Sequence, residues 1–432
     1  MLSMGIFITR LALIIVYSEL LFLAAFCKYQ KFMSNNLTAL DLFAGAGGLS
    51  LGFEKADFKV PIAVEVDDWA ADTYENNRKD LKVLRTDIKE ISDHYFGQMT
   101  GLDVVMGGPP CQGFSISAGN RRKLDDPRNA LYRHFLRAVR LTKPRIVLME
   151  NVKGILTARN QEGDLILDDI RSTLINLGYN VSYGLVNAVT FGVPQDRIRF
   201  FLIAGLDASF RSALDPNLYF QNSPLFGKDS FQISLWDSIS DLPTVVPKEI
   251  EENSIFQYEM GPQNEYQRKL RRSSDTIWNH VPMRHTQRVI DRFKLIEIGR
   301  NQTSVPIVNG PRKRSAPNDL SGVIYDQNHR RLNPYKPSPT ITASFYSSFI
   351  HPFEHRNLTV REAARIQSFP DTYKFYGKRT TLSKKLLARK GIFEDIHLDQ
   401  FNQVGNAVPP LLAETLARRI FNLIKEVTSN AN

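Results

Sequence analysis

The sequence TALDLFAGAGGLSLGF, Thr38 to Phe53, contains a short apolar run that ends in a glycine-rich turn. The residues after the turn have the composition of a helix. Glycines allow a ligand to approach the backbone, and the N–H groups at a helix N-terminus face that ligand. The pattern therefore predicts a strand, a turn and a helix at the ligand-binding edge of an α/β sheet.

Similar apolar runs recur along the first half of the chain. Buried strands are expected at VPIAVEVD (60–67), LDVVMGGPP (102–110) and RIVLMENV (145–152). Helices are expected at WAADTYENN (69–77) and at ALYRHFLRAVRLTKP (130–144). Apolar strands that alternate with helices are typical of a parallel sheet covered on both faces. We therefore predict a doubly wound, mostly parallel α/β domain.

The chain has 432 residues, of which 43% are hydrophobic and 23% charged, and this length is sufficient for two domains. The alternation ends near residue 206, and the following residues are irregular, with basic runs at 268–272 and 312–314. Residues 408–427 form an amphipathic helical pattern. We predict a doubly wound domain (33–206), a smaller irregular domain (207–400) and a C-terminal helical segment (401–432).

The N-terminal 32 residues differ from the rest of the chain. The apolar run Leu11 to Phe26 carries Glu19 and is short for a membrane span. We interpret residues 1–32 as an untranslated or unfolded extension, with Met33 as the start of the protein, and we expect no membrane association.

Charge and cysteine content narrow the possible partners. The net charge of +10 favours a polyanion such as nucleic acid, although an unspecialised basic surface is equally consistent with it. The two cysteines, Cys27 and Cys111, exclude a disulfide framework and suit a reducing compartment. No His/Cys spacing indicates zinc, so we expect no metal.

Acidic residues follow the glycine turn at two later strand ends. Glu65 ends the second strand, about 20 residues on, where a carboxylate can hold ribose hydroxyls. Asp87 follows a possible third strand and could reach an adenine edge. The spacing is not GxGxxG, and acids rather than basic groups flank the turn, which disfavours a dinucleotide. We therefore expect an adenosine-bearing cofactor.

The loop GGPPCQGFS, Gly107 to Ser115, holds one thiol in a stiff setting, because its two prolines fix φ. A thiolate adds well to an electron-poor ring carbon, and Glu150, at the end of the next strand, could donate to a ring nitrogen. The alternative is a small apolar cysteine and a surface glutamate. Arg197 and Arg199 alternate in QDRIR, so a strand would place both on one face, suited to a phosphate or a base carbonyl.

The ordered set DLFAGAGG, VEVD, TDI, GGPPCQGFS, ENV, QDRIR, RRLNPYKPSPTITA and QVGNAVPP resembles the DNA (cytosine-5)-methyltransferases of bacterial restriction-modification systems, from about residue 38 to residue 420. The resemblance implies S-adenosylmethionine as cofactor and a methyltransferase fold. It implies that Cys111 attacks cytosine C6, that Glu150 binds N3 and the exocyclic amine, and that Arg199, supported by Arg197, grips the flipped base. The cofactor residues implied by the resemblance are Phe43 (against the adenine), Ala44, Gly45, Gly47, Gly48, Glu65 (ribose), Asp87 (adenine amine), Pro109 and Asn406. Val66 stands where some members have a tryptophan against the adenine.

The resemblance also implies partners and location. The resemblance makes residues 33–206 the S-adenosylmethionine-binding catalytic domain and 207–400 the target-recognition domain, with 401–432 as a helix that returns to the catalytic domain. The substrate would be a specific duplex DNA sequence, read by the target-recognition domain. A cognate restriction endonuclease would act on the same site without forming a complex. We expect a cytoplasmic monomer. The nearest alternative is an RNA (tRNA) cytosine-5 methyltransferase of the same fold. A nicotinamide oxidoreductase would have no use for Cys111 beside Glu150, and a catalytically silent DNA-binding relative would not need them intact.

Overall fold

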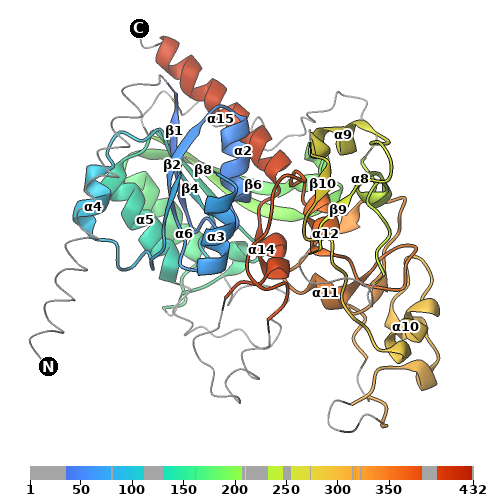
Figure 1. The fold of residues 1–432 in the computed structure, drawn as a ribbon. Coiled ribbons are helices and arrows are strands. Elements are labelled where there is room, and N and C mark those ends of the chain that lie inside the picture. Colours follow the sequence, from blue (N-terminus) through green and yellow to red (C-terminus); the bar gives the residue numbers. More distant parts are fainter. Residues whose placement is uncertain are drawn as a thin grey trace, which may run out of the picture.

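The protein is described here from a computed structural model (Figure 1). The structure describes residues 36–78, 81–110, 130–160, 162–206, 210, 232–246, 254–272, 274–313, 316, 318–321, 324–381 and 397–430. The expected N-terminal extension, residues 1–32, lies outside these ranges. Among the helices within them, none is long and apolar enough to cross a membrane.

A seven-stranded sheet forms the centre of the first part of the molecule. Its strands are β1 (Thr38–Leu42), β2 (Lys59–Val64), β3 (Lys82–Leu84), β4 (Val104–Gly107), β5 (Ile146–Asn151), β6 (Tyr179–Asn187) and β8 (Ile198–Leu206). Their order is β3-β2-β1-β4-β5-β8-β6. The first five run parallel, and β8 is antiparallel to both β5 and β6. The predicted mostly parallel α/β sheet is therefore confirmed.

Helices cover both faces of the sheet (Figure 1). One face packs on α4 (Asp93–Gln98), α5 (Leu131–Thr142) and α6 (Ile166–Asn176). The other packs on α2 (Gly48–Lys55), α3 (Asp68–Asn76) and α15 (Pro410–Asn430). Successive strand residues face opposite sides, so Leu40 joins the first cluster while its neighbour Ala39 joins the second. Two buried faces explain why these strands are almost continuously apolar.

The C-terminal helix α15 lies against α2, the helix that follows the glycine turn (Figure 1). This approach requires glycine at two positions. A Cβ atom at Gly48 would lie 2.3 Å from the carbonyl oxygen of Val408, and one at Gly52 would lie 2.3 Å from Cβ of Ala413. The N-terminal part of α15 therefore packs closely on α2, the helix that begins at the glycine turn.

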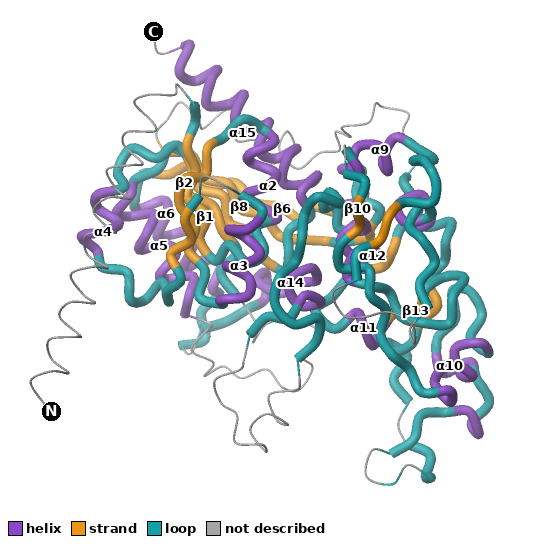
Figure 2. Tube along the Cα trace, in the orientation of Figure 1, coloured by secondary structure: helices purple, strands orange, loops and turns teal. Residues whose placement is uncertain are grey.

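The second part of the molecule, whose helices and strands lie between residues 235 and 406, consists mostly of loops. Strands concentrate in the first part (Figure 2). Its α-helices are α8 (Leu235–Ile239), α9 (Glu265–Arg271), α10 (Gln287–Lys294), α11 (Phe345–Ser348), α12 (Val360–Ile366) and α14 (Gln400–Asn406). Its two-residue strands are β9 (Phe256–Gln257), β10 (Thr276–Ile277), β11 (Arg330–Arg331), β12 (Ser338–Pro339) and β13 (Phe349–Ile350), and β12 pairs with β7 (Gln195–Asp196) of the first part. Short 3-10 helices occur in the first part at η4 (Lys153–Thr157) and η5 (Ala188–Phe191). Others occur in the second part at η7 (Gln302–Ser304) and η8 (Ile307–Asn309).

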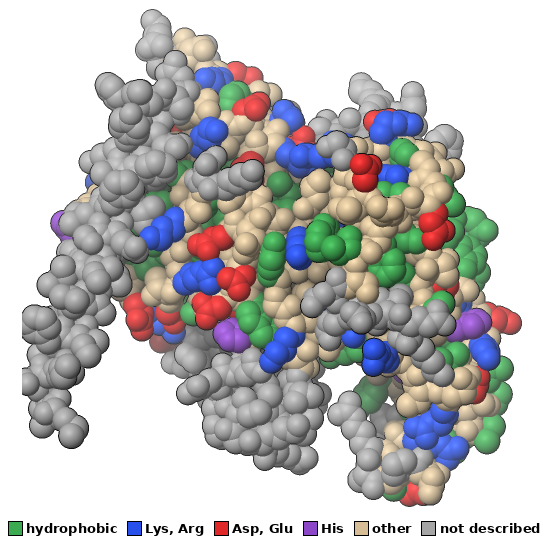
Figure 3. Space-filling model, in the orientation of Figure 1, with side chains coloured by type: hydrophobic (Ala, Val, Ile, Leu, Met, Phe, Trp, Pro, Cys, Tyr) green, Lys and Arg blue, Asp and Glu red, His purple; other side chains and the backbone are tan. Residues whose placement is uncertain are grey.

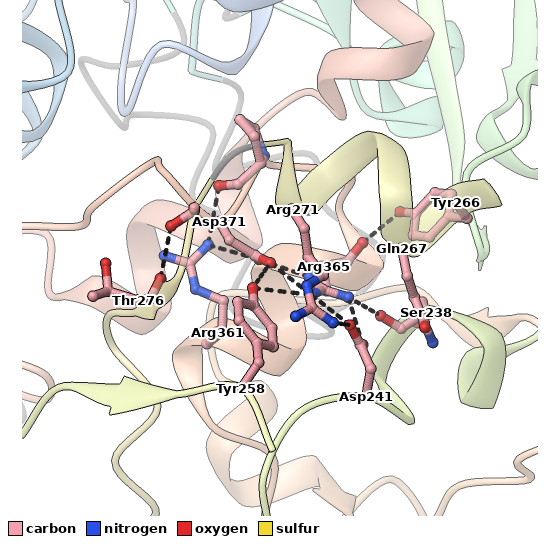
Figure 4. Close-up of polar contacts among 12 residues, drawn as sticks. Ser238, Asp241, Tyr258, Tyr266, Gln267, Arg271, Thr276, Arg361, Arg365 and Asp371 are labelled. Atoms are coloured by element: carbon pink, nitrogen blue, oxygen red, sulfur yellow. Dashed lines mark hydrogen bonds and ion pairs between the residues drawn. The ribbon is translucent and has the colours of Figure 1, made fainter. Parts of the chain in front are cut away.

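Helix α12 lies at the centre of this second part, and all seven of its residues are buried. Its N-terminus is closed by a capping box in which Thr359 and Glu362 bond each other's backbone N–H. Arg365 pairs with Asp371 at 2.6 Å and with Asp241 at 3.0 Å (Figure 4). Because a buried guanidinium must satisfy its donors, these acids fix α12 within its surroundings.

Candidate active site

The glycine turn between β1 and α2 has an unusual backbone. Phe43, Gly45 and Gly47 all have positive φ, at 60°, 54° and 77°. A Cβ atom at Gly47 would lie 2.6 Å from Cδ2 of Tyr74, so a side chain does not fit there. For Phe43 this conformation costs of order 1–3 kcal/mol, which the surrounding structure must offset. The turn is therefore held in one specific shape at the carboxyl end of β1.

Glu65, at the end of β2, binds this turn directly. Its Oε2 atom accepts a hydrogen bond from the N–H of Gly45 at 2.7 Å, and its Oε1 atom accepts one from the N–H of Asp67 at 2.9 Å. Burial raises the pKa of Glu65, and the backbone N–H groups of Asp67, Gly45 and Val66 oppose that rise. The next residue, Val66, is 66% exposed. The structure thus joins the predicted glycine turn to the predicted acid.

The remaining predicted cofactor residues lie around the same edge. Asp87 follows β3, is partly exposed, and pairs with Nζ of Lys89 at 3.4 Å. Asn406 ends α14 and is exposed, while its neighbour Ala407 approaches the turn, since a Cβ atom at Gly48 would lie 3.4 Å from Cβ of Ala407.

The start of the predicted cysteine loop lies beside the end of β5. Gly107 pairs with Met149 in register, and a Cβ atom at Gly108 would lie 3.0 Å from Oε2 of Glu150. The carbonyl of Pro109 accepts a hydrogen bond from Nδ2 of Asn151 at 3.0 Å. Cys111 and the residues after it up to 129 lie outside the described residues. The structure therefore brings Glu150 to the peptide segment that leads into the cysteine.

Glu150 and Arg199 form an ion pair on neighbouring antiparallel strands. The distance from Arg199 Nε to Glu150 Oε1 is 3.2 Å, and the two side chains are only 14% and 13% exposed. Burial raises the pKa of Glu150, although Arg199 and Arg197 oppose the rise, and burial lowers the pKa of Arg199. A raised pKa makes this carboxyl group easier to protonate than an ordinary glutamate.

Arg197 has different partners from Arg199. It is fully buried, and its guanidinium donates to the carbonyl oxygens of Ile341 (2.8 Å), Gly405 (3.0 Å) and Ala407 (3.0 Å). These bonds join the end of β7 to the segments on both sides of Asn406. The alternation predicts that both arginines lie on one face of a strand, but the terminal nitrogens of Arg197 bond backbone carbonyls of the protein.

Several contacting residues carried no role in the sequence interpretation. Asn151 lies within the ENV motif itself, which could have identified it. Arg78 donates to the carbonyl of Gly47 at 2.8 Å, and Tyr373 donates to the carbonyl of Ala46 at 2.5 Å. Neither belongs to a motif, and no local pattern marks them. Within the described ranges, no group of three or more His, Cys, Asp or Glu side chains could hold a metal ion.

Comparison with known proteins agrees with this arrangement. The model of the C-5 cytosine-specific DNA methylase family matches residues 37–422. The type II methyltransferase M.DdeI of Desulfomicrobium norvegicum is 43% identical over 385 residues, covering 89% of this chain and 88% of the relative. The type II methyltransferase M1.HphI of Haemophilus parahaemolyticus is 32% identical over 415 residues, covering 95% and 92%.

Solved structures show the same fold. An Escherichia coli prophage protein, described as a DNA modification methyltransferase, is 27% identical with a TM-score of 0.66, covering 90% of this chain and 99% of that one. DNMT2 of Spodoptera frugiperda, at 15% identity and a TM-score of 0.52, covers 89% and 99% and shows the fold alone. On its sequence, its sheet and these relatives, the chain belongs to the C-5 cytosine-specific DNA methylases.

Proposed function

We propose that this DNA (cytosine-5-)-methyltransferase moves the methyl group of S-adenosylmethionine to C5 of a cytosine flipped out of duplex DNA. The reaction would pass through a transient bond between Cys111 and cytosine C6. The observation that carries the proposal is the buried Glu150–Arg199 pair beside Gly108, three residues before Cys111 in the chain.

The residues at the glycine turn fit the proposed cofactor. Each carboxylate oxygen of Glu65 accepts a backbone N–H, and a carboxylate has about four acceptor sites, so capacity remains to accept from the ribose hydroxyls. The exposed side chain of Val66 and the ring of Phe43 would offer apolar surfaces for the adenine, and Asp87 would take the adenine amine. Ala44, Gly45, Gly47, Gly48, Pro109 and Asn406 would line the remainder of this site. When bound, the cofactor supplies an electrophilic methyl group on a sulfonium.

The protein groups must then activate a carbon that is a poor nucleophile. The Cys111 thiolate forms a bond to C6, while Glu150 donates its proton to N3, and C5 becomes an enamine carbon. After C5 has accepted the methyl group, water removes the C5 proton, Glu150 regains the N3 proton, and the bond from sulfur to C6 breaks. Cysteine and glutamate therefore end the cycle in their starting states.

Arg199 and Arg197 would support these steps in different ways. Arg199, which pairs with Glu150, would contact the flipped base and orient the carboxyl group. Arg197 would act as a positioning residue, because it holds the backbone on both sides of Asn406. A base inside a duplex cannot be attacked at C6, so the cytosine must leave the stack, at a cost of a few kcal/mol.

Each of the three predicted segments of the chain would have its own role. Residues 33–206 would hold cofactor and catalytic groups, 207–400 would read the DNA sequence, and 401–432 would return to the first part. On the face drawn in Figure 3, Lys and Arg side chains are spread over both parts, which suits contacts with phosphates along a duplex. We further propose that the enzyme is a cytoplasmic monomer and that a restriction endonuclease shares its target site.

Duplex DNA carrying 5-fluorocytosine at the target tests the covalent step. Fluorine at C5 cannot leave as a proton does, so the adduct should persist on a denaturing gel with wild-type protein and be absent with Cys111→Ser. Bisulfite sequencing of DNA from expressing cells first defines the target. Methylation of ordinary DNA without any trapped adduct would refute the covalent mechanism, and methylation of tRNA alone would refute the choice of DNA.

A further inference from the structure

The segment Pro370–Gly377 of the second part lies along α3, behind the glycine turn. Asn77 and Lys374 exchange two hydrogen bonds: Asn77 Nδ2 donates to the Lys374 carbonyl at 2.7 Å, and the Lys374 N–H donates to Asn77 Oδ1 at 2.9 Å. The N–H of Tyr376 donates to Oγ1 of Thr73 at 2.8 Å. These bonds dock the segment on the first part of the molecule.

Two side chains at this junction hold the backbone of the glycine turn. The hydroxyl of Tyr373 donates to the carbonyl of Ala46 at 2.5 Å, and Nη2 of Arg78 donates to the carbonyl of Gly47 at 2.8 Å. Nη1 of Arg78 also donates to the Tyr373 hydroxyl at 2.9 Å. Because peptide units are planar, fixing two consecutive carbonyl oxygens fixes the orientation of the corresponding peptide planes in the turn.

Tyr373 is in turn held from the second part. Arg361 donates to the carbonyl of Tyr373 at 2.5 Å and to that of Pro370 at 3.1 Å. Asp371 is bound by Arg365, at the centre of the polar network drawn in Figure 4. The buried charges of α12 therefore determine where the Tyr373 hydroxyl lies, and that hydroxyl contacts the turn.

From this chain of contacts we propose that Tyr373 is a positioning residue for cofactor binding, so that the second part completes the cofactor site. The inference rests on the proposed function, in which the glycine turn binds S-adenosylmethionine. The Tyr373 ring is buried against Phe369 and Phe375, and Tyr373→Phe retains this packing while removing only the hydroxyl.

Tyr266 provides a matched control. Its hydroxyl also donates to a backbone carbonyl, that of Arg365, at 2.5 Å, and both tyrosines are 3% exposed. Tyr266→Phe therefore removes a buried tyrosine hydroxyl that bonds a backbone carbonyl but does not contact the glycine turn. The two variants separate loss of stability from loss of cofactor positioning.

The experiment measures S-adenosylmethionine affinity of the full chain by calorimetry, together with melting temperature and steady-state kinetics. We expect Tyr373→Phe to raise the cofactor Kd and KM by roughly tenfold, because the variant loses the hydrogen bond to Ala46 and the one from Arg78, with kcat at saturation within about twofold of wild type. Tyr266→Phe should lower the melting temperature comparably and leave the cofactor Kd unchanged.

An unchanged Kd in Tyr373→Phe would overturn the inference, as would an equal rise of Kd in both variants. If wild-type protein bound no S-adenosylmethionine, the proposed function would fail first, and the inference with it. A Tyr373→Phe effect on kcat alone would also contradict a positioning role in cofactor binding.

Discussion

Replacing Glu150 by glutamine tests proton donation at the proposed active site. The amide has nearly the same size as the carboxyl group and can still accept from Arg199 Nε, which lies 3.2 Å from Oε1. It can donate a hydrogen bond to N3 of cytosine, but it cannot transfer a proton. Glu150→Gln therefore separates proton transfer from hydrogen bonding.

The expected magnitudes follow from the burial of this pair. General acid catalysis contributes about 10²- to 10⁴-fold, so kcat should fall by that factor, about 3–5 kcal/mol of barrier. Arg199 is 14% exposed and would lose its charged partner, but the amide oxygen remains. Breaking a buried pair outright costs about 3–5 kcal/mol, so a loss of roughly 2 kcal/mol in unfolding free energy is expected.

Single-turnover methylation of target DNA at saturating cofactor measures the first effect, and urea denaturation measures the second. Because burial raises the pKa of Glu150, the wild-type rate should fall as pH rises through that pKa, and this decline should vanish in the variant. Glu414→Gln is the control, since its carboxylate pairs with Arg418 on α15, away from the sheet edge, and its kcat should be unchanged. A Glu150→Gln enzyme that kept more than about a tenth of wild-type kcat would refute proton transfer by this residue.

Three further changes probe the glycine turn and the helices that pack beside it. Glu65→Ala leaves the N–H of Gly45 without its acceptor and should weaken cofactor binding at least tenfold in calorimetry, while DNA affinity in gel shifts stays near wild type; the opposite pattern would place Glu65 wrongly. Burial raises the pKa of Asp41 from an ordinary 3.8 to about 7, so folding favours its protonated form and the wild type should lose roughly 4 kcal/mol of stability as pH rises from about 4 to 7. Asp41→Asn should lack this loss in urea denaturation across that pH range, and parallel curves for the two proteins would contradict it. Gly52→Ala, which on an exposed helix would stabilise, should cost about 1–3 kcal/mol here because its Cβ would lie 2.3 Å from that of Ala413, and an unaltered denaturation midpoint would show that α15 can move away freely.

The alternating strands and helices of the first part were predictable because the sequence patterns that mark them lie within short stretches of the chain. Apolar runs of strand length, separated by helical segments, placed β2, β4 and β5 and helix α5 within a few residues of their observed bounds, at Lys59–Val64, Val104–Gly107, Ile146–Asn151 and Leu131–Thr142. The sequence of the second part has no such periodic apolar pattern. Its strands are two residues long, and its core depends on buried arginines such as Arg361 and Arg365. A charged residue in a sequence is normally expected at the surface, and only its partners show that it is buried.

By itself, the sequence determined which chemical groups the enzyme has and at which end of the sheet they gather, since strand ends, glycine turns and motif spacing are set by neighbouring residues. Only the tertiary structure decided how those groups are held. Arg197 and Arg199, two positions apart, have different partners, because one reaches the carbonyls of residues 341, 405 and 407 and the other reaches Glu150. Tyr373 contacts Ala46 across 327 positions of sequence, and such a contact exists only once both parts of the chain have packed together.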